Sequence, residues 1–258
     1  MTTSWGGVAG WYDELLAEDD TYQAKVILPN LLRLVAPQPG ETILDLACGQ
    51  GFFSRAFAEK GANVVGADIA PELIEKAGNK DSLGTKTVFV VTPSHDLSMI
   101  EKGTIDKIVI VLALQNIEKI KETMEECTRV LKKGGALFIV LNHPAFRVPK
   151  RSSWGFDEDS NVQYRRIDAY LSESKNAIDM NPGASAIGKK SETTVSFHRP
   201  LQVYFKHLTK AGFAVTRLEE WNSHKKSEKG KRSEAEDRSR KEIPLFLCLE
   251  AVLQRQSL

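Results

Sequence analysis

Short apolar segments alternate with helical patterns through the first half of the chain, and this alternation constrains the fold most. Each apolar segment is rich in β-branched or aromatic residues, which favours strands at 42–47, 63–67, 88–91, 105–112 and 136–141. Helical patterns bounded by glycine or proline lie between them, at 52–60, 71–77 and 117–131. Strand–helix units of this length predict a parallel sheet with right-handed crossovers, hence an α/β fold.

The remaining segments complete a single domain over residues 1–258. Helical patterns at 11–17 and 22–35 form an N-terminal part, 1–36, that we expect to cover the site, and 37–142 is the expected cofactor-binding core. Residues 143–200 break the alternation, so we expect an inserted lid after the fifth strand, with a helix near 166–171. The last part, 201–258, predicts one helix to Ala211 and two strands, 213–221 and 243–253, joined by a solvated, mobile connection at 222–242.

Composition excludes several classes of protein. The 35 Lys and Arg residues balance 34 Asp and Glu residues, so the net charge of +1 gives no general attraction to nucleic acid. Three widely spaced cysteines, 48, 127 and 248, without a CxxC pair predict neither a disulfide framework nor a metal site. Neither a signal peptide nor a membrane span is evident, because the longest apolar run, 108–114, is far too short. We therefore expect a cytoplasmic monomer or homodimer.

A glycine turn joins the first strand to the first core helix, in the sequence Leu44-Asp-Leu-Ala-Cys-Gly-Gln-Gly-Phe-Phe53. Glycine lets a ligand approach the backbone amides at the start of a helix. Asp68 ends the next strand, 17 residues after Gly51, where a carboxylate can accept hydrogen bonds from both ribose hydroxyls. Together these features predict an adenosine-type ligand across the carboxyl edge of the sheet.

Two residues distinguish this turn from a dinucleotide-binding turn. Position 54 is serine where a GxGxxG pattern has glycine, and Asp45 precedes the turn. A carboxylate repels a pyrophosphate but attracts an ammonium or sulfonium group. The site therefore favours a cationic ligand over NAD.

This turn, followed by Asp68-Ile69 and by Arg129-Val-Leu-Lys-Lys-Gly-Gly135 before a buried strand, resembles the class I S-adenosylmethionine-dependent methyltransferases, specifically the type 11 group. The resemblance covers roughly residues 40 to 142 and the last two strands. It implies a Rossmann-like, mostly parallel sheet of seven strands, the last antiparallel, with helices on both faces. It also implies S-adenosyl-L-methionine as cofactor and methyl transfer to a small-molecule acceptor.

The same resemblance implies individual roles for cofactor-binding residues. Asp45 would face the methionine amino group, Asp68 would bind the ribose and Ile69 would pack on the adenine. The backbone at three turn residues and the side chains of five others would complete the site: Ala47, Gly49 and Gly51; Tyr12, Ser94, His95, Leu112 and Ala113. Ala47 stands where the family usually has glycine, and Pro93-Ser94-His95 where an acidic residue commonly meets the adenine amino group.

Three residues are candidate catalytic bases: His143, at the end of the fifth strand, and His198 and Tyr164 in the lid. A hydroxyl or protonated amine as methyl acceptor would make such a base useful. Three alternatives stay open: a methyltransferase acting on RNA or protein, a nicotinamide-dependent oxidoreductase, and a cofactor-binding module without catalysis. No nucleic-acid or membrane partner is expected.

Overall fold

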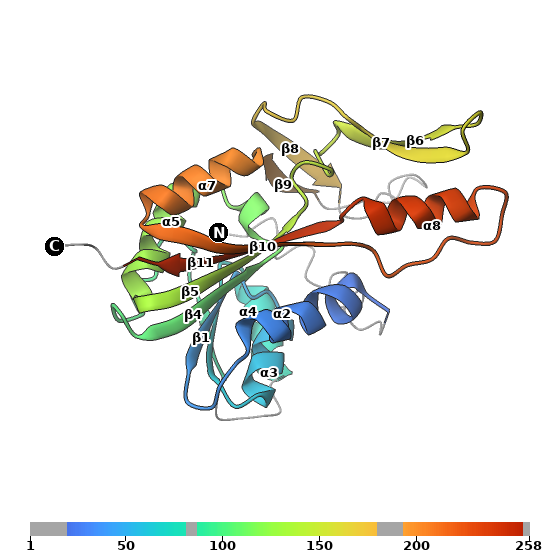
Figure 1. The fold of residues 1–258 in the computed structure, drawn as a ribbon. Helices are drawn as coiled ribbons and strands as arrows, with labels where there is room; N and C mark the ends of the chain where they lie inside the picture. The colour runs from blue at the N-terminus through green and yellow to red at the C-terminus, as the bar shows by residue number, and fades with distance from the viewer. Residues whose placement is uncertain (1–19, 81–86, 180–192, 255–258) are drawn as a thin grey trace.

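The computed structural model describes residues 20–80, 87–179 and 193–254, and Figure 1 shows their arrangement around one central sheet. The calls on 1–19, including Tyr12 and the helical pattern at 11–17, lie outside these residues. The sheet has seven strands in the order β10-β11-β5-β4-β1-β2-β3. The strands are β1 (Thr42–Leu46), β2 (Asn63–Asp68), β3 (Thr87–Val91), β4 (Ile105–Val111), β5 (Leu131–Asn142), β10 (Phe213–Trp221) and β11 (Phe246–Leu253).

The pairing of these strands confirms the expected topology. Strands β1 to β5 pair in parallel, and β11 runs antiparallel between β5 and β10. The chain therefore reverses direction only in its last strand. All of these strands lie within two residues of the predicted segments except at two starts, because β5 begins earlier, at Leu131, and β11 later, at Phe246.

Helices cover both faces of the sheet, as the alternation predicts. On one face, buried residues of α5 (Ile120–Val130) and α7 (Leu201–Lys210) pack on Leu44, Ile108 and Ile139. On the other, α2 (Leu28–Val35) and α3 (Phe52–Glu59) pack on residues that alternate with them, such as Ile43 and Val109. Figure 1 shows α5 and α7 above the sheet and α2 and α3 below it. α4 (Pro71–Asn79) packs against β2 and β3.

A change of helix type marks the N-terminal helix. Its first part is a π-helix, η1 (Gln23–Ile27), in which the N–H of Leu28 bonds to the oxygen of Gln23, and α2 follows directly. Pro29 lies in the first turn of α2 and has no N–H to continue the α-helical pattern backwards. The helix therefore switches from π to α geometry next to Pro29.

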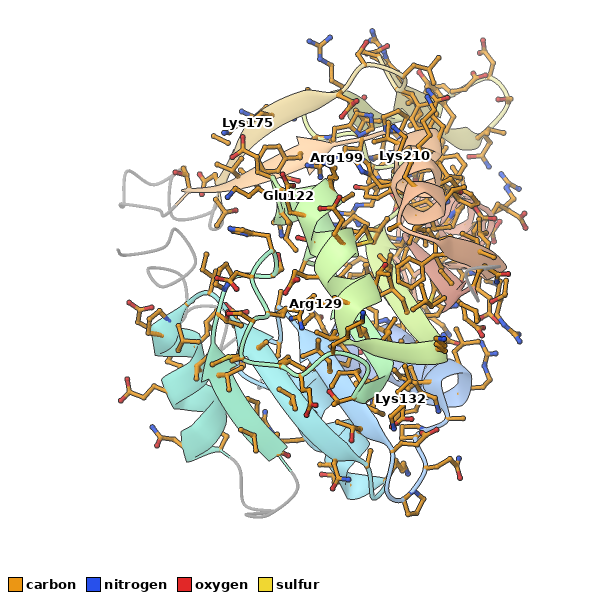
Figure 2. All side chains as sticks on the ribbon, turned by 90° about the vertical axis from the view of Figure 1, so that its left-hand side faces the viewer. Glu122, Arg129, Lys132, Lys175, Arg199 and Lys210 are labelled. Atoms are coloured by element: carbon orange, nitrogen blue, oxygen red, sulfur yellow. The ribbon has the colours of Figure 1, made fainter. Side chains whose placement is uncertain are left out.

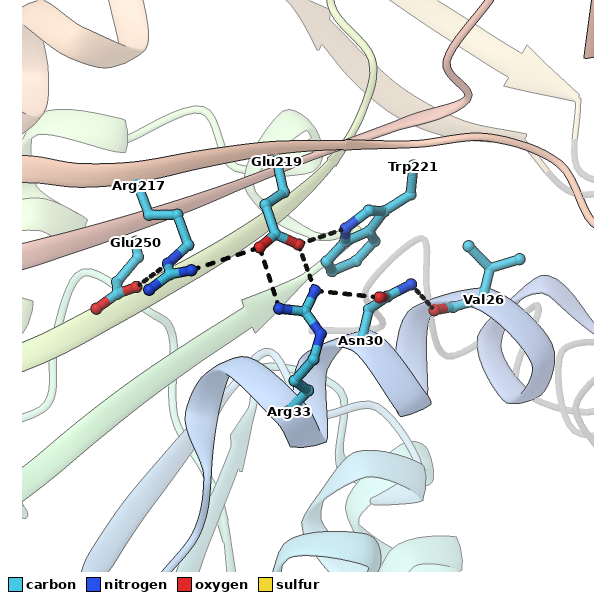
Figure 3. Close-up of polar contacts among 7 residues, drawn as sticks. All are labelled: Val26, Asn30, Arg33, Arg217, Glu219, Trp221 and Glu250. Carbon is cyan, nitrogen blue, oxygen red and sulfur yellow. Dashed lines mark hydrogen bonds and ion pairs between the residues drawn. The ribbon is translucent and has the colours of Figure 1, made fainter. Parts of the chain in front are cut away.

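Polar contacts fasten α2 to the edge of the sheet (Figure 3). Arg33 forms a 2.5 Å ion pair with Glu219 on β10. Glu219 also accepts a 3.2 Å hydrogen bond from the indole N–H of Trp221. On the helix, Arg33 donates to the side-chain oxygen of Asn30 at 3.2 Å, and Asn30 donates to the Val26 oxygen at 2.9 Å. These contacts fix the helix that precedes the core.

The insertion after β5 consists of two antiparallel hairpins. The first pairs β6 (Ser152–Asp157) with β7 (Val162–Ile167), and the second pairs β8 (Ser174–Asp179) with β9 (Thr193–His198). The expected helix near 166–171 is wrong, because Arg166 and Ile167 end β7 and the residues after them form a turn. Exposed and half-buried residues alternate strictly along β7, the two-residue period of a strand.

The expected mobile connection at 222–242 is also wrong in part, since its second half is helix α8 (Ser233–Glu242). Acidic residues in its first turn and basic residues in its last turn complement the helix dipole: Glu234, Glu236, Arg240 and Lys241. Ala235 is buried, and Arg238 donates a 2.8 Å hydrogen bond to the oxygen of Asn161 in the β6–β7 hairpin. Figure 1 shows α8 lying alongside that hairpin.

The cysteines Cys48, Cys127 and Cys248 are free and buried. Over the described ranges, no helix is long and apolar enough to cross a membrane. The described residues also hold no group of three or more His, Cys, Asp or Glu side chains placed to bind a metal ion.

Candidate functional site

A cavity of about 340 Å³, here the first cavity, opens at the carboxyl ends of β1, β2, β3 and β4. The crossover from β3 to β4 passes to the other side of β1. The connection that leaves β1 therefore runs toward one edge of the sheet, and the connection that leaves the neighbouring β4 runs toward the other edge. Such a switch point is where open α/β sheets bind ligands. The loops after these four strands supply most of its wall.

Asp45, near the end of β1, is the buried carboxylate of this cavity. Its side chain lines the wall and is 1% exposed. The hydroxyl of Ser54, on α3, donates a 2.5 Å hydrogen bond to it. The pKa of Asp45 is raised to about 6. Burial is the main cause, the Ser54 hydrogen bond opposes the rise, and the neighbouring charge of Asp68 adds to it. Asp45 has no ion-pair partner in the described part of the chain, so a ligand cation would stabilise its ionised form.

The turn after Asp45 takes left-handed backbone conformations that bring it close to the cavity. Ala47, Gly49 and Gly51 have φ values of 60°, 57° and 74°. A Cβ added to Gly49 would meet no atom within 4 Å, so this glycine leaves open space at the wall. A Cβ at Gly51 would lie 2.7 Å from the Phe89 ring. Gly51 therefore serves packing and the start of α3, and it does not line the cavity.

Asp68, the last residue of β2, holds the turn by both carboxylate oxygens. It accepts 2.9 Å hydrogen bonds from the N–H groups of Gly49 and Ala70. Burial raises its pKa, and the hydrogen bonds from Ala70 and Gly49 oppose the rise. Because Asp68 also lines the cavity, the same carboxylate can shape the turn and face a ligand.

The structure gathers the other expected cofactor-binding residues of the described chain around the same cavity. Its wall includes Ala47, Ile69, Ser94, His95, Leu112 and Ala113. Ile69 is 47% exposed, which leaves an apolar surface free for a flat aromatic ligand. Ser94 shares a 3.0 Å hydrogen bond with Thr123 on α5, so its hydroxyl is already occupied. His95 lies 3.2 Å from the amine of Lys119.

Residues 116–119 belong to the wall, although the sequence pattern placed the next helix from residue 117. They extend from the end of the short helix η2 (Leu114–Asn116) to the residue before α5. Arg199, labelled in Figure 2, follows β9 at the end of the insertion and is buried. It donates hydrogen bonds to the oxygens of Ile117 and Glu118 at 2.8 and 3.2 Å. The insertion therefore holds this wall through a buried cation.

A second cavity of about 430 Å³ adjoins the first, and Leu112 and Asn116 line both. Leu112 has a φ of 52°, a left-handed conformation that costs free energy in a residue with a Cβ. Both hairpins of the insertion contribute to the second cavity. Its other lining residues are Gln23, Gln115, Asn142, Arg147, Val148, Pro149, Lys150, Ser152, Arg165, Ile178, Thr194 and Ser196.

His143, one of the three candidate bases, lines neither cavity. Its Nδ1 accepts a 3.2 Å hydrogen bond from the N–H of Ala145, so its Nε2 carries the proton and donates at 2.7 Å to Glu220. Burial lowers the pKa of His143, and Glu220 opposes this. Both ring nitrogens are thus engaged within the protein.

His198 and Tyr164 also lie away from the cavity walls. The buried His198 contacts the oxygen of Tyr170 through Nε2 at 2.7 Å. Tyr164 is 48% exposed and lies opposite Gly155 in the β6–β7 hairpin. The three candidate bases are therefore not brought together.

Cys48 lines the first cavity, yet its environment opposes reactivity. Burial, with the charges of Asp45 and Asp68, raises the pKa of the thiol well above its ordinary value. A thiolate is the reactive form of cysteine, so this residue is inert near neutral pH.

Known proteins are similar to this chain in sequence and in fold. The Methyltransferase domain family matches residues 44–139. A putative methyltransferase of Bacillus subtilis, YqeM, is 30% identical over 223 residues, covering 82% of this chain and 87% of the relative. A demethylmenaquinone methyltransferase of Clavibacter sepedonicus is 32% identical over 141 residues, and there the chain spans only 57% of the relative's length. The crystal structure of an S-adenosylmethionine-dependent methyltransferase from Mesorhizobium loti superimposes with a TM-score of 0.69 at 24% identity, covering 91% of this chain and 99% of that one.

Proposed function

This chain belongs to the class I S-adenosylmethionine-dependent methyltransferases, and from that premise we propose that it methylates a small molecule held in the second cavity. One observation carries the proposal: the first cavity, which holds the buried carboxylate of Asp45 with no ion-pair partner among the described residues, meets the acceptor-sized second cavity at Leu112 and Asn116.

The residues of the first cavity fit the cofactor. Asp45 would hold the ammonium group of its methionine part, and Asp68 would hold the ribose hydroxyls. The open space at Gly49 admits a ligand against the backbone, and exposed Ile69 offers an apolar surface for the adenine. The bound cofactor supplies a methyl group activated by a positively charged sulfur.

The chain's own contribution to the reaction is to position the acceptor and exclude water. Methyl transfer is a displacement at an activated carbon, so orientation of the acceptor supplies much of the acceleration. The Gln115 side chain donates to the Leu112 oxygen at 2.7 Å, which turns its own oxygen away from that contact. This oxygen is buried and has no hydrogen-bond partner among the residues that the structure describes. Because Gln115 lines the second cavity, its oxygen can accept from a hydroxyl or amine of the acceptor and orient it.

A small acceptor suits this chain better than RNA, which is the alternative. In the basic segment at 225–232, two of the five cations pair with acids of the same chain: Lys225 with Asp20, and Arg232 with Glu158. Paired cations offer little attraction to a phosphate backbone. The hairpins of the lid also wall the cavity, which limits what can enter it.

Labelled cofactor distinguishes these functions. The purified full chain is incubated with methyl-labelled S-adenosylmethionine and a cell extract separated into small-molecule, RNA and protein fractions. We expect label in the small-molecule fraction, and its loss in an Asp45→Asn variant. Label in RNA or protein alone would contradict a small-molecule acceptor and support a methyltransferase acting on RNA or protein.

A further inference from the structure

Three cationic side chains line the second cavity, and no Asp or Glu is among its described lining residues. They are Arg147, from the segment after β5, Lys150 from the same segment, and Arg165 from β7. Unlike the basic segment at 225–232, this group lies in a concavity next to the cofactor site. Its charges therefore call for a different explanation.

Arg147 is the clearest member of the group. Among the described residues its guanidinium makes no hydrogen bond and no ion pair, although nearly every arginine inside a protein finds an acceptor. Surrounding protein atoms lower its pKa, and the nearby Arg165 cation lowers it further. Both side chains nevertheless remain charged at neutral pH, because an arginine cannot be deprotonated there. Folding thus places one cation, unpartnered in the described part of the chain, beside another.

Arg165, the second cation, is held in place by neutral groups. Its Nε donates to the oxygen of Phe146 at 2.9 Å, and a terminal nitrogen donates to the Ser152 hydroxyl at 2.8 Å. Its guanidinium lies over the Trp154 ring, 5.0 Å from the centroid. Neutral groups orient this cation from three sides and leave its charge uncompensated.

Like charges held together without a carboxylate oppose folding, and an anionic ligand removes that opposition. The planar guanidinium donors match the oxygens of a carboxylate or phosphate in pairs. We infer that the methyl acceptor is a small anion whose carboxylate or phosphate group is bound by Arg147 and Arg165. This inference rests on the proposed function and names the class of its acceptor.

The rest of the cavity restricts the acceptor further. Apolar Val148, Pro149 and Ile178 share its wall with the orphan oxygen of Gln115. The acceptor that fits these groups carries an anionic group, an apolar part, and a hydroxyl or amine that donates to Gln115. The two arginines line only the second cavity, whereas Asp45 and Asp68, the carboxylates proposed to bind the cofactor, line only the first.

Binding of simple probes tests the inference without turnover. The full chain, saturated with S-adenosylhomocysteine, is titrated at low ionic strength with phenyl phosphate, benzoate and neutral benzamide, by calorimetry or thermal shift. We expect both anions to bind more tightly than benzamide, and Arg147→Gln and Arg165→Gln to weaken them at least tenfold. Arg166→Gln is the matched control, because Arg166 neighbours Arg165 on β7, pairs with Asp168 and does not line the cavity.

The comparison of the two anions separates a phosphate-bearing acceptor from a carboxylate-bearing one. Equal binding of anions and benzamide, or anion binding that Arg147→Gln and Arg166→Gln change alike, would overturn the inference. Failure of S-adenosylhomocysteine to bind contradicts the proposed function instead, and it is measured first in the same titration. Binding of the cofactor product by both arginine variants shows that they are folded.

Discussion

The hydroxyl of Ser54 donates a 2.5 Å hydrogen bond to the carboxylate of Asp45, and both side chains are buried. The serine occupies the position at which a dinucleotide-binding turn has its third glycine. It supports an ionised carboxylate at the point where the cofactor's ammonium group is expected. The difference from the dinucleotide pattern is therefore part of the chemistry of the site.

Removing this hydroxyl weakens cofactor binding. In Ser54→Ala the Asp45 carboxylate loses the hydrogen bond that lowers its pKa, so the pKa rises above about 6 and less carboxylate is ionised near neutral pH. We expect weaker binding of S-adenosylhomocysteine by calorimetry at pH 7. In an Asp45→Asn background the same change has a smaller effect, and equal effects in both backgrounds would disprove the coupling.

Cofactor binding depends on pH through Asp45. Its pKa in the free protein is about 6, and the bound ammonium group stabilises the ionised form. A ligand that lowers a pKa releases a proton on binding, so affinity falls below pH 6, by up to about tenfold per pH unit. Calorimetry from pH 5 to 8 measures this. The Asp45→Asn variant binds more weakly and lacks this dependence; a profile as steep as that of the wild type would exclude Asp45 as its source.

Asp68 has a double role that one substitution exposes. Asp68→Ala removes the acceptor of the Gly49 and Ala70 N–H groups and the expected ribose ligand. We expect the affinity for S-adenosylhomocysteine to fall by about 1–3 kcal/mol. Asp106→Asn is the control: Asp106 accepts from the Thr42 N–H near the opposite end of β1, so that variant loses stability but keeps its affinity. Unchanged affinity in Asp68→Ala would refute the ribose role.

Ala47 tests the strain in the turn. Its φ of 60° suits glycine better than alanine. Relief of this strain outweighs the extra freedom that glycine gives the unfolded chain, so Ala47→Gly is expected to gain about 0.5–1 kcal/mol of stability. Ala56→Gly, within α3, is the matched control and loses about 1 kcal/mol or more. Urea unfolding measures both, and a loss in both variants would show that Ala47 is not strained.

His143 tests whether the mechanism needs a base at the end of β5. Both of its ring nitrogens are engaged, with Ala145 and Glu220, so His143→Gln is expected to lose stability and keep its turnover rate within a few-fold. Burial lowers the pKa of His143 below that of the unfolded chain. As the pH falls, the unfolded state therefore takes up this proton before the folded state does. The contribution of His143 to the free energy of unfolding is complete above about pH 6.5 and is lost as the pH falls below that value.

The variant should accordingly lose less stability than the wild type between pH 7.5 and 5.5. Urea unfolding at the two pH values measures the difference. A folded His143→Gln protein with strongly reduced turnover at saturating acceptor would restore the histidine as the catalytic base.

The sequence predicts the sheet well and the insertion poorly, for physical reasons. Strands such as β1, found at Thr42–Leu46 close to the expected 42–47, are mostly apolar runs between clear turn signals. The lid hairpins are mostly solvated, so β7 shows a two-residue period in exposure but none in hydrophobicity. Helix α8 has almost no apolar face, so hydrophobic periodicity does not predict it; only the charges at its two ends are typical of a helix.

The site divides in the same way. Asp45 and Asp68 lie within or at the end of regular strands, so their position at the cavity follows from the strand order. Arg147 and Arg165 reach the second cavity from the segment after β5 and from a hairpin, and no periodic pattern places them together. The side-chain oxygen of Gln115 has no hydrogen-bond partner among the described residues, a property of the three-dimensional fold that a linear pattern cannot show.

Calorimetric titration of the full chain at pH 7.5 with S-adenosylhomocysteine and with NAD, in parallel, tests the central claim most directly. The account predicts one site for S-adenosylhomocysteine that Asp45→Asn weakens, and no binding of NAD, whose pyrophosphate the Asp45 carboxylate repels. Binding of NAD without binding of S-adenosylhomocysteine would contradict it.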